Sequence, residues 1–277
     1  MSSIDLNRFA DSLVYRDGIW FSESEGSFSY PREGHEVLFQ IEEKSYWFVH
    51  RNSCIIEAIK KYPPDGIFFE LGGGNGYVSK FIQDHGHDVV LLEPSLSGIE
   101  NARRRGVVNV ICSTFENAQV NRDSIPAIGV FDVIEHMPDD ARFLMDVKDT
   151  MARKGRLYIT VPAYNFLWSE EDVFAGHFRR YTLTQLSALL KHAGFDIEYA
   201  SYYFSSLVIP IFLLRTIPHA IGVRRRVTAE RAKRELVLDA GIVRSALGIF
   251  LNRELTKIRN GRSIACGSSC MVVARAQ

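Results

Sequence analysis

A glycine-rich stretch behind a carboxylate is the first place where this sequence could do chemistry. Residues 68–76 read FFELGGGNG, so Glu70 comes just before glycines at positions 72, 73, 74 and 76. Glycines after a strand let backbone amides approach a ligand closely, and that ligand is most often a phosphate. Glu70 would repel a phosphate, so the ligand of this turn must tolerate a neighbouring carboxylate.

Three ligand classes compete for the turn. A P-loop needs Lys and then Ser or Thr after its glycines, whereas Tyr77 and Val78 follow Gly76. A dinucleotide fingerprint needs a third glycine where this chain has Tyr77, and its pyrophosphate would face Glu70. S-adenosylmethionine carries an ammonium, a carboxylate and a sulfonium, but no phosphate. Glu70 can bind that ammonium directly or through water, and the helix N-terminus near Tyr77 favours the carboxylate.

A second acid supports the adenosine half of this ligand. Glu93 ends the next apolar run, where a carboxylate can accept hydrogen bonds from both ribose hydroxyls. An NAD enzyme would place an acid similarly, so Glu93 indicates adenosine rather than the whole ligand. Tight strand–helix contact without any ligand is the remaining alternative for the glycines.

Apolar and amphipathic runs alternate along the middle of the chain. We expect helices at 37–62, 77–85, 96–105, 139–151 and 184–193 and strands at 66–71, 88–93, 107–112, 127–131, 155–161 and 196–204. Near-continuous apolar strands separated by helices predict a mostly parallel α/β sheet covered on both faces. A last apolar run, 264–274, returns after a helical excursion, and we expect it antiparallel at the sheet edge.

Several motifs together resemble the class I S-adenosylmethionine-dependent methyltransferases. The resemblance rests on ExGxGxG at 70–76, the acid at Glu93, FDVIEHM at 131–137 and RKGRLYITVP at 153–162, and it covers about residues 46–204. It implies a Rossmann-like, doubly wound, seven-stranded sheet with the last strand antiparallel. It also implies that residues 113–115 touch the adenine. The predicted cofactor-binding residues are Glu70, Gly72, Gly73, Gly74, Gly76, Glu93, Pro94, Ser113, Thr114, Phe115, Phe131 and Asp132.

The chain therefore divides into four predicted parts. They are an N-terminal arm and lid helix (1–62), the S-adenosylmethionine-binding core (63–204), a basic helical insertion (205–262) and a final edge strand of the core (263–277).

The FDVIEHM motif bears on the methyl acceptor. If it is helical, Asp132, Glu135 and His136 share one face, at i, i+3 and i+4. The ubiquinone-biosynthesis O-methyltransferases have a similar acidic-x-x-Glu-His run, which implies a divalent metal beside a phenolic acceptor. Here Asp132 stands where those enzymes have Glu, and Glu-His without metal is widespread in the superfamily. We therefore expect no metal, and keep these three side chains as the alternative ligand set.

Residues 163–182 form an aromatic-rich loop after the fifth strand, where open α/β sheets bind their ligands. Methyl transfer is an in-line displacement, so a base is needed only for an acceptor such as a hydroxyl. His177 is the first candidate base, His136 the second, and Tyr164 a third catalytic candidate. A packed lid without chemistry is the alternative. The predicted substrate-binding residues are Tyr46, Trp47 and Arg51 before the core, and Trp168, Arg179, Arg180 and Tyr181 in this loop.

Charge is uneven although the whole chain sums to zero, and nothing in the composition argues for nucleic acid. Residues 205–262 carry twelve basic and four acidic side chains, a net +8 that includes the run Arg224, Arg225 and Arg226. A second run places Val243, Leu247, Phe250, Leu255 and Ile258 on one side. Pro210 makes the apolar part too short and broken to cross a membrane. Basic apolar helices favour an anionic membrane surface or an anionic acceptor, with a substrate lid or homodimer contact as alternatives.

Cysteine usage and the N-terminus bear on the compartment. We expect the four cysteines, Cys54, Cys112, Cys266 and Cys270, to be reduced core residues of a cytoplasmic protein, with peripheral membrane contact as an alternative. The sequence begins without a basic start and an apolar stretch, so we expect no secretory signal.

The predicted function is methyl transfer from S-adenosylmethionine to a small or lipid- or glycan-linked acceptor, at oxygen. The alternatives are a non-catalytic S-adenosylmethionine-binding module and an NAD-type oxidoreductase.

Overall fold

The computed structural model describes residues 4–23, 32–223, 237 and 242–277. The prediction for Arg224–Arg226 and the side chain of Val243 lie outside these residues. The strands are β1 (Leu13–Arg16), β2 (Ile19–Ser22), β3 (Phe68–Leu71), β4 (Val89–Glu93), β5 (Asn109–Cys112), β6 (Ile125–Phe131), β7 (Met151–Pro162), β8 (Phe195–Tyr203) and β9 (Ser269–Ala276).

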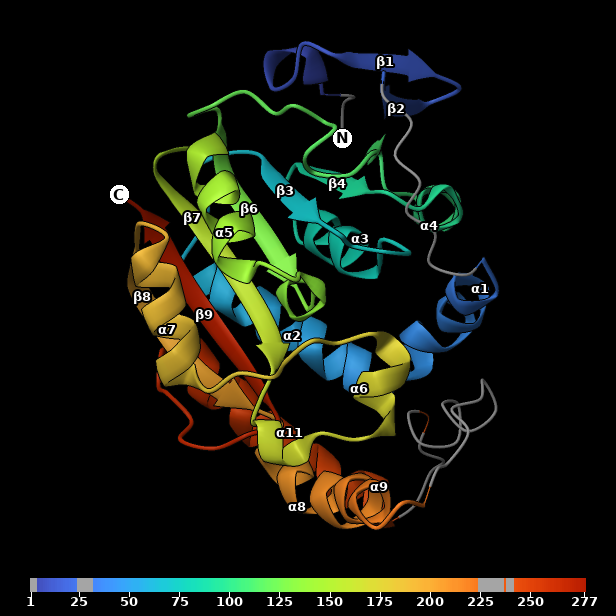
Figure 1. Ribbon diagram of the computed structural model, residues 1–277, viewed down its shortest axis with the longest axis vertical. Coiled ribbons are helices and arrows are strands. Elements are labelled where there is room, and N and C mark those ends of the chain that lie inside the picture. The colour runs from blue at the N-terminus through green and yellow to red at the C-terminus, as the bar shows by residue number, and fades with distance from the viewer. Residues whose placement is uncertain (1–3, 24–31, 224–236, 238–241) are drawn as a thin grey trace.

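The helices lie between and beside these strands (Figure 1). They are α1 (Arg32–Ile41), α2 (Tyr46–Lys61), α3 (Tyr77–Asp84), α4 (Leu96–Arg104), α5 (Asp140–Thr150), α6 (Glu170–Ala175), α7 (Leu183–His192), α8 (Val208–Ile211), α9 (Ile217–Ala220) and α11 (Ile242–Arg259). Shorter turns are η1 (Leu6–Arg8), η2 (Glu42–Lys44), η3 (Ile134–His136), η4 (Asn165–Leu167), η5 (Ser205–Leu207) and the π-helical η6 (Phe212–Thr216).

One sheet joins all nine strands in the order β1-β2-β5-β4-β3-β6-β7-β9-β8. The central strands β5, β4, β3, β6 and β7 are parallel. Alternate residues of β3 point to opposite sides: Phe68 joins a core with α2, α3 and α11, and Phe69 joins a core with α5 and α7. The predicted Rossmann-like, mostly parallel sheet with an antiparallel last strand is confirmed.

The expected place of the last strand is wrong. β9 lies between β7 and β8 and pairs antiparallel with both, so that Val273 is opposite Tyr158 on one side and Tyr199 on the other. β8, not β9, forms that edge of the sheet. A strand that returns after a long excursion can enter a gap between two earlier strands, and the apolar run alone does not distinguish a gap from an edge. The observed strand also begins later, at Ser269.

The N-terminal arm extends the sheet beyond the seven core strands. β1 and β2 form a hairpin, and β2 pairs parallel with β5 through Trp20 and Phe21. The long helix expected at 37–62 is two helices separated by η2. Ser45 causes the break, because its hydroxyl accepts hydrogen bonds from the backbone amides of Trp47 and Phe48 and so caps α2.

The basic insertion is helical where it is described. α8, η6 and α9 form one irregular run, and α11 lies along α2. The predicted apolar side of α11 is only partly right, because Ile258 is buried whereas Phe250 is 51% exposed. Among the described residues, no helix has both the length and the hydropathy needed to span a bilayer.

The four cysteines are not all core residues. Cys54 and Cys270 are buried and Cys112 is half-buried, but Cys266 is exposed in the loop before β9, which corrects the expectation for this residue.

Candidate functional site

The glycine turn after β3 has the conformation that glycine allows most easily. Gly72, Gly74 and Gly76 have φ values of +70°, +54° and +69°. Gly73 is needed for another reason, since a Cβ there would lie 2.5 Å from the Leu91 side chain and 2.6 Å from the carboxylate carbon of Glu70. The turn thus passes directly over Glu70.

Glu70 lies beneath this turn at the end of β3 and is 1% exposed. The Ser79 hydroxyl, on α3, donates a short hydrogen bond to it. Burial raises the pKa of Glu70 to about 7, although the hydrogen bond from Ser79 and the charge of Arg51 act in the opposite direction. An ammonium ligand nearby would favour the charged form of this carboxylate.

Glu93 ties the end of β4 to the same turn. Its two carboxylate oxygens accept hydrogen bonds from the backbone amides of Gly74 and Ser95, each at 2.9 Å. Burial raises the pKa of Glu93, and these two hydrogen bonds lower it in part. Each oxygen keeps a second lone pair, so this carboxylate can still accept hydrogen bonds from a ligand.

The other predicted cofactor-binding residues lie at the carboxyl ends of neighbouring parallel strands. Pro94 follows β4, Ser113 to Phe115 follow β5, and Phe131 ends β6 with its ring stacked on Phe68 at 6.4 Å. Since the strands are parallel and in register, these ends meet at one edge of the sheet. The structure therefore brings the predicted cofactor set together.

Asp132, at a φ of +57°, turns the chain sharply after β6. Its carboxylate pairs with the Arg51 guanidinium of α2 at 2.7 Å, and both side chains are largely buried. The Arg51 guanidinium also lies over the rings of Trp47 and Phe48. Trp47 stacks on Phe204 at 5.6 Å, and Tyr46 packs against the same core. These contacts fix α2 above the end of β6.

The FDVIEHM motif is not one continuous helix, because the turn at Asp132 leaves only the short η3. The three polar residues of the motif therefore do not share a face: Asp132 faces Arg51, whereas His136 lies beside His177, with ring centroids 4.7 Å apart. Burial lowers the pKa of His136, and the neighbouring His177 lowers it further.

His177 is held by a buried carboxylate that the sequence reading missed. Its Nδ1 lies 2.9 Å from the Asp172 carboxylate of α6, and Arg180 makes two hydrogen bonds to the same carboxylate. Burial alone would raise the pKa of Asp172, but the hydrogen bonds from His177 and Arg180 hold it down at about 2. A charged Asp172 favours the tautomer with hydrogen on Nδ1, which leaves Nε2 of His177 able to accept a proton.

Glu135 is the least satisfied polar group of the site. It is fully buried, and within the described part of the chain neither carboxylate oxygen has a hydrogen-bond partner. Burial and the nearby Asp132 raise its pKa well above the usual value. One ligand atom each from Glu135, His136 and His177 lie within 4.8 Å of one another, a donor set that suits a transition metal. A metal at this site would be bound by Glu135, His136 and His177, so His177 would replace Asp132 in the alternative ligand set given above.

The remaining predicted acceptor residues stabilise the loop. Arg179 pairs with Asp140 at 2.7 Å, and the Tyr181 hydroxyl donates to the same carboxylate. Tyr164, at a φ of +59°, stacks on Tyr202 at 5.0 Å, and burial raises its pKa. Trp168 is half-buried. Contact of any of these residues, or of Arg180, with an acceptor stays a prediction.

The functional residues that the sequence reading missed are Ser79, Asp140 and Asp172. Asp172 had a detectable signal: Ser169 and Asp172 have capping-box spacing at the start of α6. Ser79 and Asp140 carry no such signal, because their partners are defined only by the fold.

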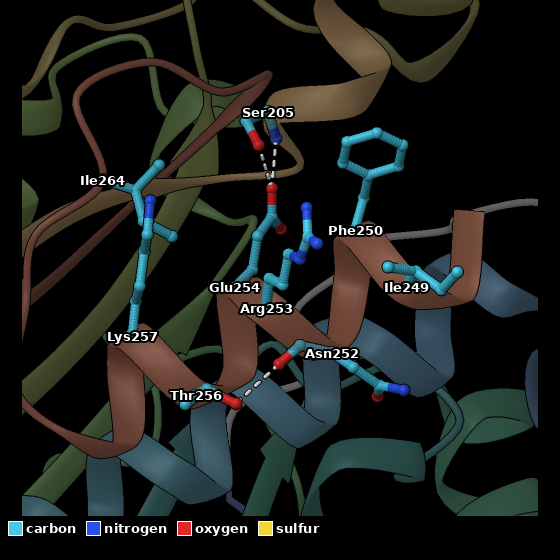
Figure 2. A pocket seen from close by; sticks show the side chains of 9 residues that line it. All are labelled: Ser205, Ile249, Phe250, Asn252, Arg253, Glu254, Thr256, Lys257 and Ile264. Atoms are coloured by element: carbon cyan, nitrogen blue, oxygen red, sulfur yellow. Dashed lines mark hydrogen bonds between the residues drawn. The ribbon is translucent and has the colours of Figure 1, made fainter. Parts of the chain in front are cut away.

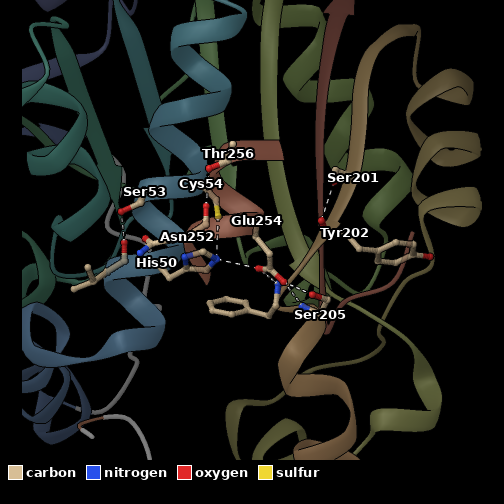
Figure 3. Close-up of polar contacts among 11 residues, drawn as sticks. His50, Ser53, Cys54, Ser201, Tyr202, Ser205, Asn252, Glu254 and Thr256 are labelled. Carbon is tan, nitrogen blue, oxygen red and sulfur yellow. Dashed lines mark hydrogen bonds and ion pairs between the residues drawn. The ribbon is translucent and has the colours of Figure 1, made fainter. Parts of the chain in front are cut away.

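A second buried polar cluster joins α2 to α11 (Figure 3). Nε2 of His50 lies 3.0 Å from the Glu254 carboxylate, which also accepts hydrogen bonds from the backbone amides of Phe204 and Ser205 and from the Ser205 hydroxyl. Burial would raise the pKa of Glu254, but these hydrogen bonds lower it overall. The cluster fixes the insertion to the core.

A cavity of about 640 Å³ borders this cluster, and Ser205 and Glu254 belong to both (Figure 2). Its lining comes from α11, Ser205 and Ile264, with no residue of the glycine turn. Arg253 and Lys257 give it a basic wall, and Ile249 and Phe250 an apolar one.

A family model described as a methyltransferase domain matches residues 49–200, more than half of the chain. The chain therefore belongs to the class I S-adenosylmethionine-dependent methyltransferase family, and S-adenosylmethionine is the cofactor of that family, as predicted.

Two curated relatives are S-adenosylmethionine-dependent methyltransferases described as probable, from Mycolicibacterium smegmatis and Mycobacterium tuberculosis. Each is 23% identical, over 61% and 58% of this chain. The matches span 66% and 60% of those relatives, slightly under two thirds of their length.

Solved structures agree on the fold. A methyltransferase of Haloferax volcanii, in complex with the Trm112 methyltransferase activator, matches with a TM-score of 0.55 at 14% identity, over 88% of this chain and 93% of its own. An S-adenosylmethionine-dependent methyltransferase of Thermotoga maritima matches with a TM-score of 0.53 at 17% identity, over 88% and 95%. These likenesses show the fold alone.

Proposed function

We propose that this protein transfers the methyl group of S-adenosylmethionine to a hydroxyl oxygen of a small or lipid- or glycan-linked acceptor. The observation that carries the proposal is the His177–Asp172 pair, because it places an oriented imidazole in the loop after β7. The glycine turn with Glu70 and Glu93 would hold the cofactor at the neighbouring strand ends.

The reaction balances with the residues present. The acceptor oxygen attacks the methyl carbon as the bond from that carbon to sulfur breaks, and the sulfonium leaves as a neutral thioether. The hydroxyl proton passes to Nε2 of His177, whose charge the Asp172 carboxylate stabilises. Arg180 keeps Asp172 charged and in place, so it is a positioning residue.

His136, the second imidazole of the site, has a different role in this proposal. His136 lies against His177 and has a lowered pKa, so it stays neutral and supports the face of the base. Tyr164, whose pKa is raised, can donate a hydrogen bond to the acceptor but does not serve as the base.

The exposed aromatic side chains around His177 favour an acceptor with an apolar part. Phe174 and Phe178 are both more than half exposed beside the base. Such rings would bind an amphiphilic acceptor better than a fully polar one.

The test is methyl transfer from isotope-labelled S-adenosylmethionine into extracted metabolites and lipids, with products identified by mass spectrometry. The proposal predicts a label on oxygen together with stoichiometric S-adenosylhomocysteine. A label on nitrogen or carbon would contradict oxygen transfer. Tight cofactor binding without product across all extracts would instead favour the non-catalytic binding module.

A further inference from the structure

The exposed large apolar side chains gather in one region of the molecule. Seventeen are exposed in the described part of the chain, and thirteen of them lie in the loop 166–178, the run 209–223 and residues 249–250. The elements that carry them, α6, α8, α9 and the start of α11, lie at one end of the molecule (Figure 1). Apolar residues scattered singly over a surface need no explanation, but a concentration of this kind marks an interaction site.

The helical run of the insertion carries its apolar residues in a regular row. Ile209, Leu213, Ile217 and Ile221 follow one another at intervals of four residues along α8, the π-helical η6, α9 and the residue that ends α9, and all four are exposed. Ile209 is 69% exposed and Ile221 is 72% exposed, so both ends of this row face outward. We call these four residues the apolar row.

Basic residues lie next to the apolar surface. On α11, Arg253 and Lys257 follow Ile249 at intervals of four, and all three line the cavity together (Figure 2). Glu254 also lines this cavity, but its carboxylate is engaged by His50 and Ser205, as Figure 3 shows, so Arg253 and Lys257 are left in excess. The outer side of α11 is therefore basic, in keeping with the net +8 of residues 205–262.

This surface is joined to the acceptor loop by three contacts. Phe212 packs edge-on against Phe166 at 6.1 Å. His219 lies 3.2 Å from Glu170, and Arg215 lies 3.7 Å from Glu171. Both acids belong to α6, the helix whose Asp172 orients His177. The apolar surface and the candidate base are thus parts of one connected unit.

We propose that the apolar row and the basic side of α11 dock on an anionic lipid surface. An apolar stripe flanked by Arg and Lys is the pattern of helices that lie in the headgroup region. A second copy of the chain fits less well, because a two-fold interface here would bring the basic sides of two α11 helices, with Arg253 and Lys257, together. Docking would turn the acceptor loop toward the bilayer, so that the methyl acceptor would be an amphiphile of the membrane. The inference about the acceptor rests on the proposed function, whereas the docking itself does not.

The test is co-sedimentation with phosphatidylcholine–phosphatidylglycerol vesicles at low salt, compared with phosphatidylcholine vesicles. The proposal predicts binding to the anionic vesicles that weakens as salt is added. Changing Ile209→Glu and Leu213→Glu together should lower the partition coefficient about tenfold or more, because two inserted side chains become charged. Changing Arg253→Glu and Lys257→Glu together should lower it about tenfold on anionic vesicles only.

A matched pair of changes controls for added negative charge. Tyr15→Glu with Val108→Glu replaces two exposed apolar side chains at other places on the molecule and should leave the partition coefficient unchanged. Circular dichroism and S-adenosylmethionine calorimetry without vesicles report separately on folding and on cofactor binding. Failure of the proposed function would appear as absence of labelled product in the methyl-transfer assay and would leave vesicle binding intact.

Three results would overturn the docking proposal. The first is no wild-type binding to anionic vesicles at low salt. The second is binding that the Ile209→Glu, Leu213→Glu variant retains in full. The third is a wild-type dimer in sedimentation velocity that this variant converts to a monomer without vesicle binding, since a second copy would then cover the surface.

Discussion

The predicted cofactor end of the molecule comprises the glycine turn with Glu70 and Glu93. The predicted acceptor end comprises α2, the loop 163–182 and the insertion 205–262. The contacts that stabilise these two ends differ in how far apart their partners lie along the chain. At the cofactor end, Ser79 bonds Glu70 from nine residues away and Gly74 bonds Glu93 from nineteen. At the acceptor end, Arg51 reaches Asp132 across 81 residues, and His50 reaches Glu254 across 204. Local contacts therefore define the glycine turn. The acceptor end has local contacts of its own, from Asp172 to His177 and Arg180, but its lid helix and its insertion are positioned by contacts that need the completed fold.

This difference explains why the cofactor end resembles a protein family in sequence whereas the acceptor end does not. A glycine turn, a strand and a helix can bind the same nucleoside in many chains. The acceptor end combines a loop, an insertion and a lid helix, each free to vary, and such segments carry specificity.

Replacing His177 with Ala should have the largest effect, and only on the acceptor end. Loss of the base should lower kcat by about 10²- to 10⁴-fold. The Kd for S-adenosylmethionine should change by less than about twofold, because the two ends are separate. Stopped-time assays of S-adenosylhomocysteine and calorimetry measure the two quantities, with His87→Ala as the matched control. Equal losses in both would remove His177 from the role of base.

The Arg51–Asp132 ion pair joins the two ends. Arg51→Met should lower the free energy of unfolding by about 3 kcal/mol, because Asp132 is left largely buried without its partner. The double change Arg51→Met with Asp132→Asn should recover most of that loss in urea unfolding. Arg142→Met, in the exposed pair with Asp146, is the control, with an expected cost below about 1 kcal/mol. An Arg51→Met loss no larger than this control would show that the pair does not join the ends.

Glu70 should make the stability of the cofactor end depend on pH. Its pKa of about 7 in the folded state lies above the usual 4.5, so the folded protein binds the extra proton. The stabilisation is complete below pH 4.5 and is lost as the pH rises through 7, a change of about 3 kcal/mol. The free energy of unfolding of the wild type minus that of Glu70→Gln should therefore decrease by about 3 kcal/mol between pH 4.5 and pH 8. A constant difference would mean that Glu70 is charged throughout.

Gly73→Ala tests the cofactor end with a smaller change. The new methyl group would meet Leu91 and Glu70, so we expect a loss of about 1–3 kcal/mol in unfolding free energy and weaker cofactor binding. Gly248→Ala, in α11 with open space around it, should stabilise the protein by up to about 1 kcal/mol. Unchanged cofactor affinity in Gly73→Ala would show that the turn lies away from the ligand.

Chelation should have the smallest effect. Because the proposed base acts without a metal, EDTA treatment should leave turnover unchanged. A drop that added Zn²⁺ restores would instead assign Glu135, His136 and His177 as ligands.

The glycine turn and the ends of β3 and β4 could be predicted from the sequence because their signals are local, whereas their contact with S-adenosylmethionine stays a prediction. Glycines in a tight turn, an acid at the end of each of two strands and the alternation of apolar runs are all recognisable within about twenty residues of sequence. The place of β9 could not be predicted, since pairing with both β7 and β8 depends on which strands leave a gap. Asp172 was missed because its partner Arg180 was assigned to the substrate instead.

The central place of β9 also has a consequence for synthesis on the ribosome. Among the strands that the structure describes, β8 pairs with β9 alone, so a nascent chain that has just completed β8 has no neighbouring strand for it. At ordinary elongation rates the ribosome needs roughly 4–15 s to add residues 204–276 and supply the missing neighbour. Until then the backbone edges of β7 and β8 can pair with other chains. We therefore expect folding of the nascent chain to depend on a chaperone that shields these edges.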